Sequence, residues 1–230
     1  MVKIAVTALL FWGTITGAQT KPSDIIGAID SQGYTLTKYP ALRALQMRER
    51  TWALAHGPEV FQVLQDSADA KQRKIASGLL GYAQQSQDQI AALVHASRDP
   101  DPDVRNNATR ALGVLVESNV KLAAEIEPDT FIAMLGSGIW TDRNKAIWLL
   151  VPMTAERDPQ LLTKIRAQAF GQLVEMARWS DYGHAAGARL VLGRLAGIAE
   201  DKLEPMLWNG PPDAIIEAAR ASGKSITGTH

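Results

Sequence analysis

Residues 101–117 read D-P-D-V-R-N-N-A-T-R-A-L-G-V-L-V-E and predict one capped amphipathic helix. Asp101 is a favourable N-cap, and Pro102 suits the first helical position because that position needs no N–H donor. Small and apolar residues then recur on one face at helical spacing: Val104, Ala108, Ala111, Leu112 and Leu115. The stretch therefore predicts a helix whose small side chains let a neighbouring helix approach closely.

Weaker copies of this helix recur along the chain. The shared pattern is an arginine, a small residue at +3, apolar residues at +6 and +7, and glycine at +8. It is complete in residues 73–81 and 105–113, ends in valine in 143–151, and lacks the arginine in 185–193. The last position advances by 32, 38 and 42 residues between copies, and another apolar helical segment precedes each copy, at 60–64, 90–94, 131–135 and 161–176. Paired helices at this period predict an α-solenoid.

The run D-P-D-V-R-N-N-A-T-R-A-L-G at 101–113 resembles the second helix of a HEAT repeat, including the short kind found in phycobilisome-lyase-like proteins. The resemblance covers residues 58–208 and is strongest at 69–117. It implies an all-α fold, an α-solenoid of antiparallel helix pairs as in an armadillo-type superhelix. It also implies that the arginines at 73, 105 and 143 tie neighbouring repeats through an acidic or carbonyl partner. Function stays open, because such repeats serve as scaffolds, binding platforms and occasional enzymes.

The first 18 residues are typical of a secretory signal peptide. Lys3 supplies a positive head, residues 4–12 form an apolar core, and Thr16 and Ala18 place small residues before a possible cleavage site. The apolar run is short for a membrane span. We therefore expect a periplasmic or secreted protein, with no membrane insertion after cleavage. The alternative is that this segment is a first core helix.

The regions that flank the repeats are expected to cap the two ends of the solenoid. Residues 20–57 predict an N-terminal helical cap, with a short helix over 23–29, a loop over 34–40 and a longer helix over 41–56. Residues 209–221 predict a C-terminal capping helix, and the small, polar residues 222–230 predict a disordered tail.

The composition limits the partners that the chain can have. Lys and Arg number 24, as do Asp and Glu, so the formal net charge is zero. A neutral chain has no evident electrostatic reason to bind nucleic acid or an anionic membrane. No cysteine is present, which excludes disulfides and thiolate metal sites.

The search for catalytic, cofactor and metal motifs finds none. Asp99, Asp101 and Asp103 alternate like the first ligands of a calcium loop, but prolines separate them, and a turn with a helix cap is the preferred interpretation. Asp181 lies three residues before His184, which suits either an acid–base pair or, as we prefer, an N-cap. We expect no cofactor and no metal.

One row of residues points away from the predicted core face. The +5 positions of the four copies are Gly78, Arg110, Trp148 and Leu190. The HEAT resemblance implies that second helices line a concave surface. The predicted binding residues on that surface are Trp148, Arg110, Asn106, Asn144, Lys74 and Tyr82. The alternative for Trp148 is packing under an irregular segment, because Pro152 must distort the same helix.

The sequence therefore predicts a non-enzymatic, exported interaction or scaffold module that binds a protein or peptide on its concave face. Two alternatives stay open. One is a small-ligand protein or lyase-like enzyme on a helical scaffold, which requires converging ionisable groups in a pocket. The other is a stabilising subunit with no ligand in the groove.

Overall fold

The computed structural model describes residues 26–29, 35–208 and 211–226. These residues fall into two compact units, unit 1 up to Thr130 and unit 2 from Phe131 onward. The predicted signal peptide lies outside the described residues. Among the described helices, none has the length and apolar character needed to cross a bilayer.

The start of unit 1 differs from the prediction. A two-stranded antiparallel sheet pairs β1 (Ile26–Ile29) with β2 (Thr35–Thr37), where the sequence predicts a short helix over 23–29. A seven-residue helix is marginal by itself, whereas β-branched residues favour a strand that a partner strand completes. The longer helix is present as α3 (Pro40–Ala55), close to its predicted bounds of 41–56.

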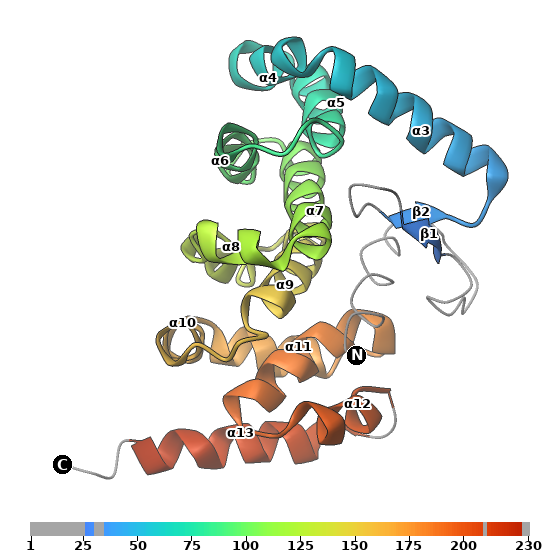
Figure 1. The fold of residues 1–230 in the computed structure, drawn as a ribbon. Helices are drawn as coiled ribbons and strands as arrows, with labels where there is room; N and C mark the ends of the chain where they lie inside the picture. Colours follow the sequence, from blue (N-terminus) through green and yellow to red (C-terminus); the bar gives the residue numbers. More distant parts are fainter. Residues whose placement is uncertain (1–25, 30–34, 209–210, 227–230) are drawn as a thin grey trace. The chain divides into compact units, whose positions relative to one another are not determined.

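The rest of unit 1 consists of paired helices, as predicted. Its helices are α4 (Gly57–Asp66), α5 (Ala70–Leu80), α6 (Gln87–Ala96) and α7 (Pro102–Ser118), followed by the 3-10 helix η2 (Val120–Glu125). Figure 1 shows α4 and α6 in one layer and α5 and α7 in the other. Unit 1 is therefore a stack of antiparallel helix pairs.

The helix α7 forms for the reasons that its sequence predicts. Asp101 accepts hydrogen bonds from the backbone N–H groups of Asp103 and Val104, at 2.9 and 3.1 Å, and Pro102 opens the helix. The five predicted core residues of this helix are all buried. A Cβ added to Gly81, at the end of α5, would lie 2.9 Å from Ala111 Cβ. The small residues therefore allow the close contact between α5 and α7.

Unit 2 is organised around one buried helix. Its helices are α8 (Asp129–Met134), which begins at the end of unit 1, α9 (Trp140–Met153), α10 (Pro159–Ala177), α11 (Tyr182–Leu195), α12 (Glu200–Trp208) and α13 (Asp213–Ile226). Every residue of α11 from Ala185 to Leu195 is buried, and α9, α10, α12 and α13 all contact it. The predicted helix pair α10–α11 is present, and α8 and α9 follow one another in the predicted order.

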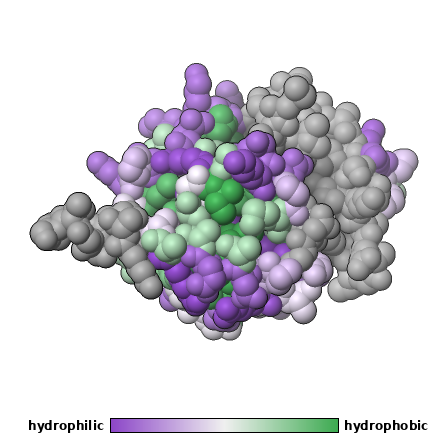
Figure 2. Space-filling view, turned by 90° about the horizontal axis from the view of Figure 1, so that it is seen from below, coloured by the Kyte–Doolittle hydropathy of each residue, from purple (hydrophilic) through white to green (hydrophobic). Residues whose placement is uncertain are grey.

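The last helix extends beyond its predicted end. The sequence predicts disorder from residue 222, but α13 continues to Ile226. Ser222 Oγ donates to Leu195 O at 3.1 Å and accepts from Arg166 Nη2 at 2.9 Å, so contacts distant in sequence hold this turn. Figure 2 views the molecule from this end and shows apolar residues surrounded by hydrophilic ones. Residues 227–230 lie outside the described part.

Candidate functional site

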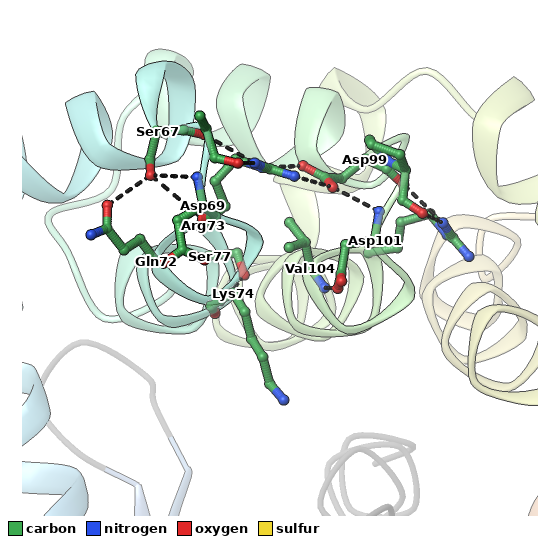
Figure 3. A network of polar contacts seen from close by, with 12 residues as sticks. Ser67, Asp69, Gln72, Arg73, Lys74, Ser77, Asp99, Asp101 and Val104 are labelled. Carbon is green, nitrogen blue, oxygen red and sulfur yellow. Dashed lines mark hydrogen bonds and ion pairs between the residues drawn. The ribbon is translucent and has the colours of Figure 1, made fainter.

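Unit 1 contains a network of polar contacts between successive repeats (Figure 3). Arg73 donates from Nε to Asp99 Oδ2 at 2.7 Å and from Nη2 to Asp99 Oδ1 at 2.9 Å. Its Nη1 donates to the backbone carbonyls of Ser67 and Ala68. The hydrogen bonds from Arg73 lower the pKa of the Asp99 carboxyl below its ordinary value. This two-point geometry joins the turn before α5 to the turn before α7.

The same arginine position is used differently in each repeat. Arg105 donates from Nη1 to the carbonyls of Asp99 and Pro100, at 2.8 and 3.0 Å, which repeats the carbonyl contacts of Arg73. Arg143 instead pairs with Glu175 Oε1 at 2.9 Å and lies over the Trp179 ring. All three arginines have acidic or carbonyl partners, as predicted. Arg73 and Arg143 reach carboxylates 26 and 32 residues away, whereas the carbonyls that accept from Arg105 lie in the turn before its own helix.

Four of the six predicted binding residues lie together in unit 1, on α5, on the turn after it and on α7. Asn106 Nδ2 donates to Asn107 Oδ1 at 3.3 Å, and Asn107 Nδ2 donates to Lys74 O at 2.9 Å, so two amides bridge from α7 to α5. Lys74 Nζ pairs with Asp103 Oδ2 at 2.7 Å on the exposed edge. Gly78 lies beside this bridge, and a Cβ there would make an ordinary contact of 3.6 Å with Asn107 Nδ2.

Tyr82 and Arg110 complete this group at the other end of α5. Burial raises the pKa of the Tyr82 hydroxyl, while the positive charge of Arg110 and a hydrogen bond with Gln46 lower it in part. Both side chains are partly exposed. We call Lys74, Asn106, Asn107, Arg110 and Tyr82 the amide surface. It combines donors and acceptors with one aromatic ring.

The other two predicted residues, Asn144 and Trp148, lie in the core of unit 2. Each is 3% exposed, and a Cβ added to Gly187 of α11 would lie 3.5 Å from Trp148 Cε2. The prediction for Trp148 assumes that one face of its helix is exposed to solvent. All residues of α9 from 144 to 151 are buried, so this part of the helix has no such face. Packing, the alternative prediction, accounts for Trp148. Pro152 lies in the last turn of α9, one residue before its end. We therefore leave both residues out of the amide surface.

The prediction omits residues that belong beside this surface. Asn107 is next to Asn106 in the sequence, but only the contact with Lys74 O reveals its bridging role. Gln46 and Arg50 of α3 reach Tyr82, and no local pattern in the sequence places α3 there. The buried face of α3 could be found only from the tertiary structure.

The carboxylates that resemble a catalytic or calcium motif have structural partners. Asp181 Oδ1 accepts from the His184 backbone N–H at 3.0 Å, as predicted for an N-cap. Asp99 pairs with Arg73, Asp101 caps α7, and Asp103 pairs with Lys74. Within the described residues, no group of three or more His, Cys, Asp or Glu side chains is arranged to hold a metal ion.

Comparisons with known proteins agree with this architecture. Residues 57–151 match the family of HEAT repeats. The designed armadillo repeat protein YIII(Dq)4CqI is similar, with a TM-score of 0.52 and 17% identity over 82% of this chain and 96% of that one.

Two further designed armadillo structures each have a TM-score of 0.49. One, designed for modular peptide recognition, is 16% identical over 79% of this chain and 85% of that one. The other, YIII(Dq.V1)4CPAF in complex with peptide (KR)4, is 14% identical over 80% of this chain and 95% of that one. No curated protein matches the chain. The chain thus has the fold of a helical solenoid like that of armadillo repeat proteins, and residues 57–151 match the model of HEAT repeats.

Proposed function

We propose that this chain is a non-enzymatic interaction module that binds an extended peptide segment of another protein on the amide surface. The observation that carries the proposal is the amide bridge from Asn106 through Asn107 to Lys74 O. The hydrophobic core of the repeats does not require these polar side chains. A carboxamide both donates and accepts, so it matches the alternating N–H and C=O groups of an extended backbone.

Arg110 and Tyr82 extend this surface with residue types suited to binding. Arginine and tyrosine are enriched among the residues that contribute most to protein–protein affinity. The ring of Tyr82 comes from the turn after α5 and the guanidinium of Arg110 from α7, and the two groups are close enough to interact electrostatically, so one ligand segment can reach both. Because repeat packing fixes the backbone on both sides of the surface, little backbone freedom is lost on binding.

A peptide-display selection against the full chain tests the proposal. We expect peptides to be enriched and the double variant Asn106→Ala/Asn107→Ala to bind them at least about tenfold more weakly. The matched control is Gln62→Ala/Gln65→Ala, which removes two exposed amides from α4. Equal binding by both variants would place the site elsewhere. Failure to enrich any peptide would refute peptide binding and would direct attention to small ligands or a lyase-like activity.

We also propose that the protein acts outside the cytoplasm, in the periplasm or after secretion. The support is the charged head, short apolar core and small residues of the first 18 positions. Mass spectrometry of the protein from the envelope fraction should give Gln19 as its first residue. An intact Met1 in the cytosolic fraction would contradict export.

A further inference from the structure

The helix α3 of unit 1 buries two polar residues and leaves several large apolar residues exposed. Its buried residues are Gln46, Arg50 and Ala53. Leu42, Leu45 and Trp52 are 48%, 49% and 48% exposed. Most helices of a soluble domain have the reverse arrangement. Figure 1 shows that α3 extends away from the paired helices α4 to α7.

Specific contacts hold α3 in this orientation. Gln46 Oε1 accepts from Thr37 N at 3.0 Å, and Arg43 Nε donates to Thr37 O at 2.8 Å. Gln46 also hydrogen-bonds the Tyr82 side chain. Turning the leucines inward would break all three contacts, so the apolar side chains remain on the surface. Single exposed apolar residues are common, but several on one helix indicate an interaction site.

The charge of this segment differs from that of the repeats. Residues 38–56 contain four basic residues and one acidic residue, a net charge of +3. Residues 57–230 contain 18 basic and 21 acidic residues, a net charge of −3. Because Arg50 is buried, the surface charge of this segment comes from Lys38, Arg43 and Arg48 against Glu49, and it is positive beside a slightly acidic array of repeats. The expectation that the chain has no electrostatic attraction to an anionic membrane does not apply to α3.

We propose that α3 binds the surface of an anionic lipid bilayer. Leucine and tryptophan side chains on an interfacial helix enter the boundary between headgroups and acyl chains, and basic residues attract anionic lipids. Trp52 suits this boundary because its ring is large and amphipathic. The binding is peripheral, in line with the absence of a membrane-spanning helix among the described residues. The proposal is independent of peptide binding on the amide surface.

The charge on α3 favours a lipid surface over a second copy of the chain. Pairing two copies of α3 would bring two positively charged segments together, which electrostatic repulsion opposes. Lipid headgroups of opposite charge are attracted by the same residues. The exposed Glu49 is the one acidic residue of the helix, so it weakens the attraction and provides a probe of it.

Co-sedimentation with vesicles tests the proposal. The full chain is mixed with vesicles of phosphatidylcholine and phosphatidylglycerol in equal parts, or of phosphatidylcholine alone. We expect the triple variant Leu42→Gln/Leu45→Gln/Trp52→Gln to bind anionic vesicles at least about tenfold more weakly. The control is Ile75→Gln on α5, where the native side chain is 62% exposed. All variants keep residues 1–37 unchanged, so this segment contributes equally to the vesicle binding of each. A difference between the triple variant and the native chain therefore reports on α3.

Two neighbouring substitutions of opposite sign sharpen the test. Arg48→Gln should weaken binding to anionic vesicles about fivefold, and Glu49→Gln should strengthen it by a similar factor. Both positions are exposed, and both substitutions introduce glutamine. Partial unfolding would weaken vesicle binding in both variants, whereas the charge argument predicts changes of opposite sign. Circular dichroism confirms that each variant keeps its helices.

The following outcomes would overturn the proposal. One is equal binding of anionic vesicles by the triple variant and the native chain. Another is equal binding of the native chain to the two kinds of vesicle. A third is a dimer, seen by light scattering, that the triple variant loses, because a second copy would then cover α3.

Discussion

Arginines stabilise both units, but they act over different distances in the sequence. In unit 1, Arg73 and Arg105 bind carbonyls five and six residues before them, and Asp99 joins neighbouring repeats. In unit 2, Arg194 is 4% exposed and binds Val151 O and Thr154 Oγ1 of another helix, about 40 residues away. The contact of an arginine with carbonyls of the preceding turn occurs in two successive repeats. The contact of Arg194 with α9 is specific to unit 2.

The buried arginines of unit 2 satisfy the ends of helices. The last carbonyl groups of a helix have no partner within it. Arg189 donates to Ala177 O at the end of α10 and to Leu207 O near the end of α12. Arg166 donates to Leu195 O at the end of α11. An irregular end of a solenoid can therefore be closed by arginines that reach from one helix to the end of another.

Glu200 connects two of the arginines of unit 2. It pairs with Arg194 at 2.9 Å and with Arg157 at 3.0 Å. Burial raises the pKa of this carboxyl, but the hydrogen bonds from Arg194 and Arg157 outweigh burial, and the pKa lies below its ordinary value. The group therefore stays charged at neutral pH and ties the start of α12 to α11 and to the loop that follows α9.

The largest expected effect comes from breaking this network in unit 2. Arg194→Leu leaves Val151 O, Thr154 Oγ1 and part of Glu200 without their partner. We expect a loss of about 3–5 kcal/mol of unfolding free energy, as for other broken buried ion pairs. Urea unfolding measures the loss. Arg220→Leu is the control, because Arg220 forms an exposed pair with Glu217, and its effect should be near zero. Equal effects would contradict the special role of Arg194.

A smaller effect is expected from the link between repeats in unit 1. Asp99→Asn keeps the shape of the side chain but removes the charge that binds Arg73, which should cost about 2 kcal/mol. The lowered pKa of Asp99 stabilises the folded chain above the ordinary pKa of the carboxyl, and this contribution disappears as the pH falls through the folded value. Urea titrations at neutral and acidic pH should therefore show a difference between variant and native chain that shrinks in acid. A constant difference would contradict this account.

The close packing of α5 and α7 predicts opposite effects at two glycines. Gly81→Ala would place its Cβ 2.9 Å from Ala111 Cβ, an overpacking that costs about 1–3 kcal/mol and is offset in part by the better helix propensity of alanine. Gly78→Ala meets ordinary contacts and should stabilise the chain by up to about 1 kcal/mol. Thermal melting of the two variants gives the signs, and a shift of both in the same direction would refute the packing argument.

The smallest effect is expected at the exposed pair of Lys74 and Asp103. Their side chains are 46% and 62% exposed, so Lys74→Gln should change stability by less than about 0.5 kcal/mol. The glutamine of this variant keeps most of the length of the lysine side chain and removes its charge. A loss comparable with that of Asp99→Asn would show that charges at the edge of the solenoid matter more than burial indicates.

The parts of the fold that could be predicted from the sequence are those whose causes are local. The cap of α7, its core face and the carbonyls that accept from Arg105 all lie within residues 99–117. They can therefore be predicted from this stretch of sequence alone. The buried setting of Trp148 and the contact of α3 with Tyr82 depend on segments distant in the sequence. The β1–β2 pairing is local, but a short apolar stretch such as 26–29 suits a helix or a strand equally. Helical counting also predicted four residues of the amide surface, because they follow from the repeat phase. It failed for α9, which is buried on every side.

Hydrogen–deuterium exchange with and without a display-selected peptide tests the central claim most directly. The account predicts slower exchange in α5 and α7, over residues 74–82 and 103–110, with no change in α4 and α6 of the other layer. Protection confined to α4 and α6, or to unit 2, would contradict the assignment of binding to the amide surface.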